Sequence, residues 1–173
     1  MCRRATGVLA LAALLVAPAV RAEDGYELWL RYRPLPSPPA IREVVMGAGS
    51  PTLRAARAEA ARGLRGMLGV DVPLADAVSR DGALVAGTPS GSPAIAALNL
   101  GADLGKVGDE GFVIRPATIA GKRATVVAAN TDVGVLYGVF RLLQRLQAGH
   151  PVDASSVVEA PRIRHRVLNH WDN

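Results

Sequence analysis

The chain has 173 residues, half of them hydrophobic, which suits one domain with its own core and is short for two. Its formal net charge of +5 does not indicate a nucleic-acid partner, because the basic residues are dispersed and aromatic residues make up only 4%. The only cysteine is Cys2, so residues 23–173 can form neither an internal disulfide nor a thiolate metal site.

The N-terminus has the order of features typical of a secretory signal peptide. Two arginines precede an apolar run over 8–17, and small residues then precede the acidic pair Glu23-Asp24. The run is shorter than the roughly 20 residues that span a bilayer, which favours a cleaved leader over a membrane anchor. We predict a signal peptide over 1–22, a secreted or periplasmic protein, and no membrane association after cleavage. Cleavage removes three arginines and no acid, so the net charge falls from +5 to +2.

The first half of the remaining sequence predicts two strands and a helix. Alternating polar and apolar residues predict a strand over 24–32, which a proline-rich segment ends, and a short strand is possible over 42–46. An alanine- and arginine-rich helix is predicted over 51–68, with Gly69 as its C-terminal cap. Its predicted buried line is Leu53, Ala56, Ala60, Leu64 and Met67. Residues 70–78 are predicted to be a connection.

The second half predicts a buried strand over 81–88, a loop over 87–93, a short helix over 94–98 and a loop over 101–109. Two further strands, over 110–116 and 123–129, are predicted to form an antiparallel hairpin around Gly121. A last strand is expected over 164–168.

The clearest unit is the strand, turn and helix over 123–147. A run rich in β-branched residues precedes Asn130-Thr131-Asp132, whose side chains suit a helix N-terminus, and a helical apolar period follows from Val133. Gly134 and Gly138 lie four apart, so we expect a neighbouring backbone to approach the helix there. The order of elements predicts a two-layer α/β (α+β) fold, a mixed sheet with helices packed on it.

Few residues suggest chemistry. The loop over 87–93 has the position of a phosphate-binding loop but neither of the usual glycine motifs, so a turn with a helix cap is favoured. The pair Asp109-Glu110 is better explained as a solvated loop than as an acid and base, because neighbours on an extended chain point apart. The histidines, His150, His165 and His170, have no metal-ligand spacing, and we expect no cofactor. The polar end Asn169-His-Trp-Asp-Asn173 is either a frayed tail or the end of a barrel strand that carries functional residues.

Several separated segments together resemble the α-glucuronidases of glycoside hydrolase family 67. They are Glu23–Tyr32, Asp81–Pro89, Gly111–Arg115, Ala128–Gly138 and Arg166–Asn173. The resemblance implies an enzyme that removes (4-O-methyl-)glucuronic acid from xylan-derived oligosaccharides. It implies that residues 23–160 are the family's N-terminal α/β domain, which is similar to the accessory domain of β-hexosaminidases, and that 161–173 begin a (β/α)8 catalytic barrel.

The same resemblance implies that the catalytic acid and base lie in the barrel, outside this sequence. We therefore assign no catalytic residue and expect the chain alone to be inactive. Trp171 matches a tryptophan that lines the glucuronate pocket and is the one predicted substrate contact. The predicted partners are glucuronoxylan oligosaccharides, bound through the barrel, and further copies of the chain, bound through the surface that the barrel would cover. The alternative is a free-standing secreted domain that binds carbohydrate or protein through Tyr26, Trp29 and Tyr32.

Overall fold

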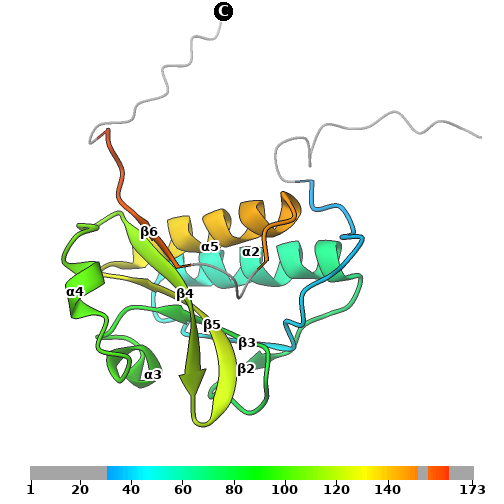
Figure 1. Ribbon diagram of the computed structural model, residues 1–173, viewed down its shortest axis with the longest axis horizontal. Coiled ribbons are helices and arrows are strands. Elements are labelled where there is room, and N and C mark those ends of the chain that lie inside the picture. Colours follow the sequence, from blue (N-terminus) through cyan, green and yellow to red (C-terminus); the bar gives the residue numbers. More distant parts are fainter. Residues whose placement is uncertain (1–30, 152–155, 164–173) are drawn as a thin grey trace, which may run out of the picture. The chain divides into compact units, whose positions relative to one another are not determined.

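The computed structural model describes residues 31–151 and 156–163, and every element in these ranges belongs to the unit Tyr32–Asn173 (Figure 1). Six strands form one sheet in the order β2-β1-β3-β5-β4-β6. The strands are β1 (Glu43–Met46), β2 (Leu74–Ala75), β3 (Ala83–Gly87), β4 (Phe112–Ile119), β5 (Lys122–Ala129) and β6 (Val157–Glu159). The helices are α2 (Pro51–Leu68), α3 (Pro93–Ala96), α4 (Gly101–Leu104) and α5 (Asp132–Gln147).

The sheet is mixed, as the order of elements predicts. Strands β2, β1, β3 and β5 run parallel, while β4 pairs antiparallel with both β5 and β6. The predicted hairpin is confirmed, with Ile119 opposite Lys122 and a two-residue turn between them. Both turn residues, Ala120 and Gly121, have positive φ angles, the backbone that matches the twist of a hairpin.

Helices cover both faces of the sheet. Helices α2 and α5 pack on one face, with a core that includes Val44, Leu64, Leu84, Val127 and Leu143. The short helices α3 and α4 and their loops cover the other face, where Val85, Ile95, Leu104, Val113 and Val126 form a second core. Figure 1 shows α2 and α5 side by side above the sheet, and α3 and α4 to its left. The predicted two-layer arrangement is confirmed, with a thin third covering of short helices added.

Helix α2 has the bounds that the sequence predicts. Ser50 caps its N-terminus by accepting a hydrogen bond of 3.1 Å from the Leu53 nitrogen, and Gly69 ends it in the left-handed region at φ 72°. Of the predicted buried line, Ala56, Ala60, Leu64 and Met67 are buried, and Leu53 is only half-buried.

Helix α5 lies close to the sheet at its two glycines, as predicted. Thr131 caps the helix by accepting a hydrogen bond of 3.2 Å from the Gly134 nitrogen. A Cβ placed on Gly134 would lie 2.6 Å from the Gly111 oxygen, and one on Gly138 would lie 2.5 Å from Cγ1 of Val127. These contacts are shorter than carbon atoms tolerate, so only glycine allows the helix to sit at this depth.

Three short elements differ from the predictions. Residues 74–75 form the edge strand β2 where a connection is predicted, residues 101–104 form α4 where a loop is predicted, and β6 is absent from the predictions. Arg31 and Tyr32, the last two residues of the strand predicted over 24–32, have no strand geometry, and residues 24–30 lie outside the described residues. So do the leader over 1–22 and the strand over 164–168. Within 31–151 and 156–163, no helix is long and apolar enough to span a bilayer.

Candidate functional site

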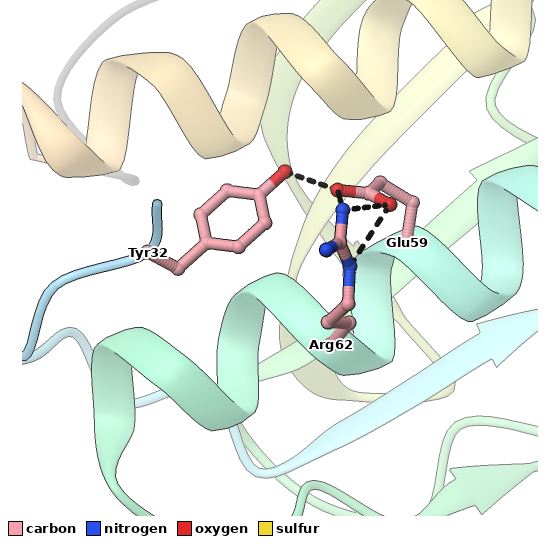
Figure 2. A network of polar contacts seen from close by, with 3 residues as sticks. All are labelled: Tyr32, Glu59 and Arg62. Atoms are coloured by element: carbon pink, nitrogen blue, oxygen red, sulfur yellow. Dashed lines mark hydrogen bonds and ion pairs between the residues drawn. The ribbon is translucent and has the colours of Figure 1, made fainter. Parts of the chain in front are cut away.

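A polar cluster joins the start of the described chain to helix α2. Glu59 and Arg62 lie three residues apart on α2 and meet on one face of the helix, where Arg62 Nη2 lies 2.9 Å from each Glu59 carboxylate oxygen. The Tyr32 hydroxyl donates a hydrogen bond to Glu59 Oε1, and the Arg62 guanidinium carbon lies 5.6 Å from the centre of the Tyr32 ring. Figure 2 shows Tyr32 reaching from the N-terminal segment toward this pair.

Two glycines of α2 make room for Tyr32. A Cβ on Gly66 would lie 2.8 Å from both Cβ and the backbone oxygen of Tyr32, and a Cβ on Gly63 would lie 3.2 Å from its Cζ. The ring packs against the core under α2 and α5. Its hydroxyl and one ring face are therefore engaged inside the domain, which counts against Tyr32 as a sugar-stacking residue. The alternative of a carbohydrate- or protein-binding domain also involves Tyr26 and Trp29. Both lie outside the described residues.

Replacing Tyr32 with phenylalanine is expected to destabilise the chain by about 1 kcal/mol, because a hydrogen bond to a half-buried carboxylate is lost. Burial, followed by the hydrogen bond and the charge of Glu59, raises the Tyr32 pKa above its ordinary value of 10.0, and the Arg62 charge only partly opposes this. The stabilisation from the neutral phenol is therefore complete below pH 10 and falls as the pH rises above it. Urea unfolding at pH 7 and pH 11 measures both effects; an equal alkaline loss in the phenylalanine variant would contradict this assignment.

A buried carboxylate stands at the amino end of β1. Glu43 is 1% exposed and accepts hydrogen bonds from the Ser79 nitrogen at 2.7 Å, from the Ser79 hydroxyl at 2.6 Å and from the Arg80 nitrogen at 3.2 Å. Arg80 Nε also lies 3.3 Å from Glu43 Oε2. Burial by itself raises the Glu43 pKa, but the Ser79 and Arg80 contacts outweigh it, so the pKa lies below its ordinary value. An ionised carboxylate with both oxygens engaged holds a loop in place and has no free position for a substrate proton.

The same edge of the sheet borders a shallow groove under the C-terminal ends of α2 and α5. The proline-rich segment over 35–39 forms one wall. Its two acids, Asp71 and Asp81, form ion pairs with Arg65 at 3.4 Å and Arg123 at 3.2 Å. The described residues of the groove therefore offer no unpaired carboxylate for acid or base chemistry.

The opposite edge, at the carboxyl ends of the parallel strands, is where ligands bind in many open α/β sheets. Here the polar side chains serve the backbone instead. Thr88 Oγ1 accepts from the Gly91 nitrogen at 3.1 Å and Ser92 caps α3, which confirms that the loop over 87–93 is a turn with a helix cap. Asn130 donates to the Leu104 and Gly108 oxygens at 2.8 and 2.9 Å. These side chains fix loops and leave no site built for a phosphate.

The remaining predicted site residues divide into two groups. His150 and Asp109 are exposed, and Glu110 is half-buried beside Asp109 in a loop. His165, His170 and the predicted substrate contact Trp171 lie outside the described residues. Over 31–151 and 156–163, no group of three or more His, Cys, Asp or Glu side chains could hold a metal ion. Sequence reasoning missed Glu43, although a glutamate inside a short apolar strand signals a buried polar contact.

Comparisons with known proteins include a family profile, a relative and a solved structure that are similar to this chain. The sequence profile described as "Glycosyl hydrolase family 67 N-terminus" matches residues 28–142. Alpha-glucuronidase A of Emericella nidulans is 35% identical over 176 residues, which cover 95% of this chain and 20% of that protein. A solved GH115 4-O-methyl-alpha-glucuronidase, described as specific for decorated arabinogalactans, shares 19% identity over 64% of this chain and 14% of its own, with a TM-score of 0.50.

These similarities support different conclusions. The similarity to the GH115 enzyme shows a shared fold alone, because the sequence identity is low. The chain spans about one fifth of the length of the Emericella enzyme, so the activity of that whole protein does not pass to the chain by similarity. The profile, by contrast, matches more than half of the chain and includes β1 to β5 and most of α5. The chain belongs to the glycosyl hydrolase family 67 N-terminal domain family.

Proposed function

We propose that this chain is the non-catalytic N-terminal portion of a secreted α-glucuronidase that removes (4-O-methyl-)glucuronic acid from xylan-derived oligosaccharides. The observation that carries the proposal is the 35% identity to Alpha-glucuronidase A over 95% of the chain. The domain would support a catalytic barrel that begins near residue 161 and supplies the acid and base.

The chemistry of the described residues is consistent with a supporting role. Inverting glycoside hydrolysis needs two carboxyl groups roughly 6.5 to 9.5 Å apart, one to protonate the leaving oxygen and one to activate water. Glu43 is held by Ser79 and Arg80, and Glu59 is held by Tyr32 and Arg62. Both carboxylates are therefore engaged by the domain's own side chains, which suits a structural role.

Recognition of the sugar is the part of the proposal that a binding measurement tests. Trp171 is the predicted contact with glucuronate, and it can stack on a sugar only if the barrel forms around it. We therefore expect calorimetric titration of residues 23–173 with aldouronic acids to give no heat of binding. Binding that Trp171→Ala abolishes would show that the chain keeps a working part of the sugar site, contrary to this proposal.

The leader predicted over 1–22 supports export to the periplasm or the medium. Expression of the whole chain in a bacterial host, followed by sequencing of the exported product, should give an N-terminus at Glu23. Retention in the cytoplasm with Met1 intact would contradict the export part of the proposal and leave the enzymatic part standing.

Without a barrel, the surface that the barrel would cover stays exposed to water, and exposed apolar surface promotes association. We expect purified residues 23–173 to form reversible oligomers whose sedimentation coefficient rises with concentration. A single species of monomer mass at all concentrations would count against this expectation.

A further inference from the structure

Helix α5 carries a second apolar stripe on the side away from the sheet. Val133 and Tyr137 are 36% and 37% exposed, and the half-buried Phe140 continues the line one turn later. Spacings of four and three residues put these side chains on one face of the helix. The buried stripe, which includes Val135, Val139 and Leu142, packs on the sheet, and the outer stripe (Val133, Tyr137 and Phe140) lies outside that buried cluster.

The chain leaves the sheet next to helix α5. The Glu159 oxygen, at the end of β6, lies 2.5 Å from where a Gly111 Cβ would stand, and the Gly111 oxygen lies 2.6 Å from the Cβ position of Gly134. Arg141 Nε also binds Glu159 Oε2 at 3.0 Å. The end of β6 is thus fixed to α5 near Gly134 and at Arg141, and Ile163, four residues further on, is 65% exposed.

We propose that the outer stripe of α5 is the surface on which the polypeptide that follows Ile163, the catalytic portion of the enzyme, docks. This inference rests on the proposed function. Two observations select that occupant: the chain exits next to the helix that carries the stripe, and the Emericella relative is about five times longer than the matched region. An apolar centre with the Arg141–Glu159 ion pair at its edge is the usual composition of an interface between domains.

A chimera provides the test: residues 23–173 replace the matching fifth of Alpha-glucuronidase A. Residues 23–173 contain no cysteine, so Val133→Cys introduces a thiol into this portion, and Val70→Cys, at a site 61% exposed in the loop after α2, is the matched control. Thiol labelling is followed peptide by peptide in the monomeric fraction, for the isolated chain and for the chimera. We expect labelling at 133 to slow by about tenfold or more in the chimera, and labelling at 70 to stay unchanged.

Equal labelling at both sites, or protection at 133 only in a dimeric fraction, would overturn the docking proposal. Val133→Asp gives a second measurement, because an acid in the first turn of α5 suits the helix N-terminus and should leave the isolated chain folded. The same change should lower the thermal stability of the chimera, while Val70→Asp should not. An active chimera without protection at 133 would refute only the docking face; an inactive, unprotected one would refute the proposed function as well.

Discussion

Glu43→Ala is expected to destabilise the chain by about 3 kcal/mol, because it leaves buried donors without their acceptor. The Ser79 nitrogen and hydroxyl and the Arg80 nitrogen all donate to this one carboxylate. Arg80 itself is exposed enough to regain water, so its charge adds little to the loss. Ser79 and Arg80 belong to the connection between β2 and β3. The loss of structure should therefore extend to β1 and β2 at this edge of the sheet. Urea unfolding at pH 7 measures the loss.

The pH dependence of the same variant separates a charge effect from a packing effect. The Glu43 pKa is lowered in the folded chain, so its stabilisation is present above its ordinary value of 4.5 and is lost as the pH falls through the folded value. The difference between the native chain and Glu43→Ala should therefore shrink in acid. Glu43→Gln keeps the volume of the side chain and removes its charge, so it serves as the control for the packing effect. A difference that stays constant from pH 7 to pH 3 would contradict the role given to the carboxylate.

Gly134→Ala is expected to cost about 3 kcal/mol through overpacking, even though alanine is the better helix former. The added Cβ would lie 2.6 Å from the Gly111 oxygen and 2.7 Å from the Ala129 Cβ. Backbone and β-carbon atoms cannot rotate away, so α5 would have to lift from the sheet. Thermal unfolding of the variant measures the cost.

Gly101→Ala is the matched control, because Gly101 also lies in the first turn of a helix and a Cβ there would meet nothing within 4 Å. This variant should be neutral or slightly stabilised. Equal unfolding temperatures for the two variants would show that the close approach of α5 to the sheet is not required.

The long elements could be predicted because their signals are local. Helix α2 has a serine cap at one end and Gly69 at the other, and α5 has Thr131 and a clear apolar period. Gly134 and Gly138 could be predicted as points of close approach, since two glycines in a helix need a packing reason. Strands β2 and β6 have two and three residues, and only their neighbours in the sheet make them strands. No local pattern could have revealed them.

The polar clusters around Tyr32 and Glu43 could not be predicted from the sequence, for a different reason. Tyr32 meets Glu59 from 27 residues away, and Glu43 meets Ser79 from 36 residues away, so their partners depend on the finished fold. Tyr32 is one of the three aromatic residues in the alternative of a binding domain, but Gly63 and Gly66 make room for its ring inside the domain. Trp171 stays a prediction, since it lies outside the described residues.

Hydrolysis is the most direct test of the central claim, that this family 67 N-terminal domain supports catalysis without performing it. Purified residues 23–173 are incubated with aldouronic acids, and released 4-O-methylglucuronic acid is quantified beside Alpha-glucuronidase A as the positive control. We predict no release above the rate without enzyme, since the buried carboxylate of Glu43 and the half-buried one of Glu59 are bound to the domain's own side chains. Release that scales with the concentration of the chain would contradict it.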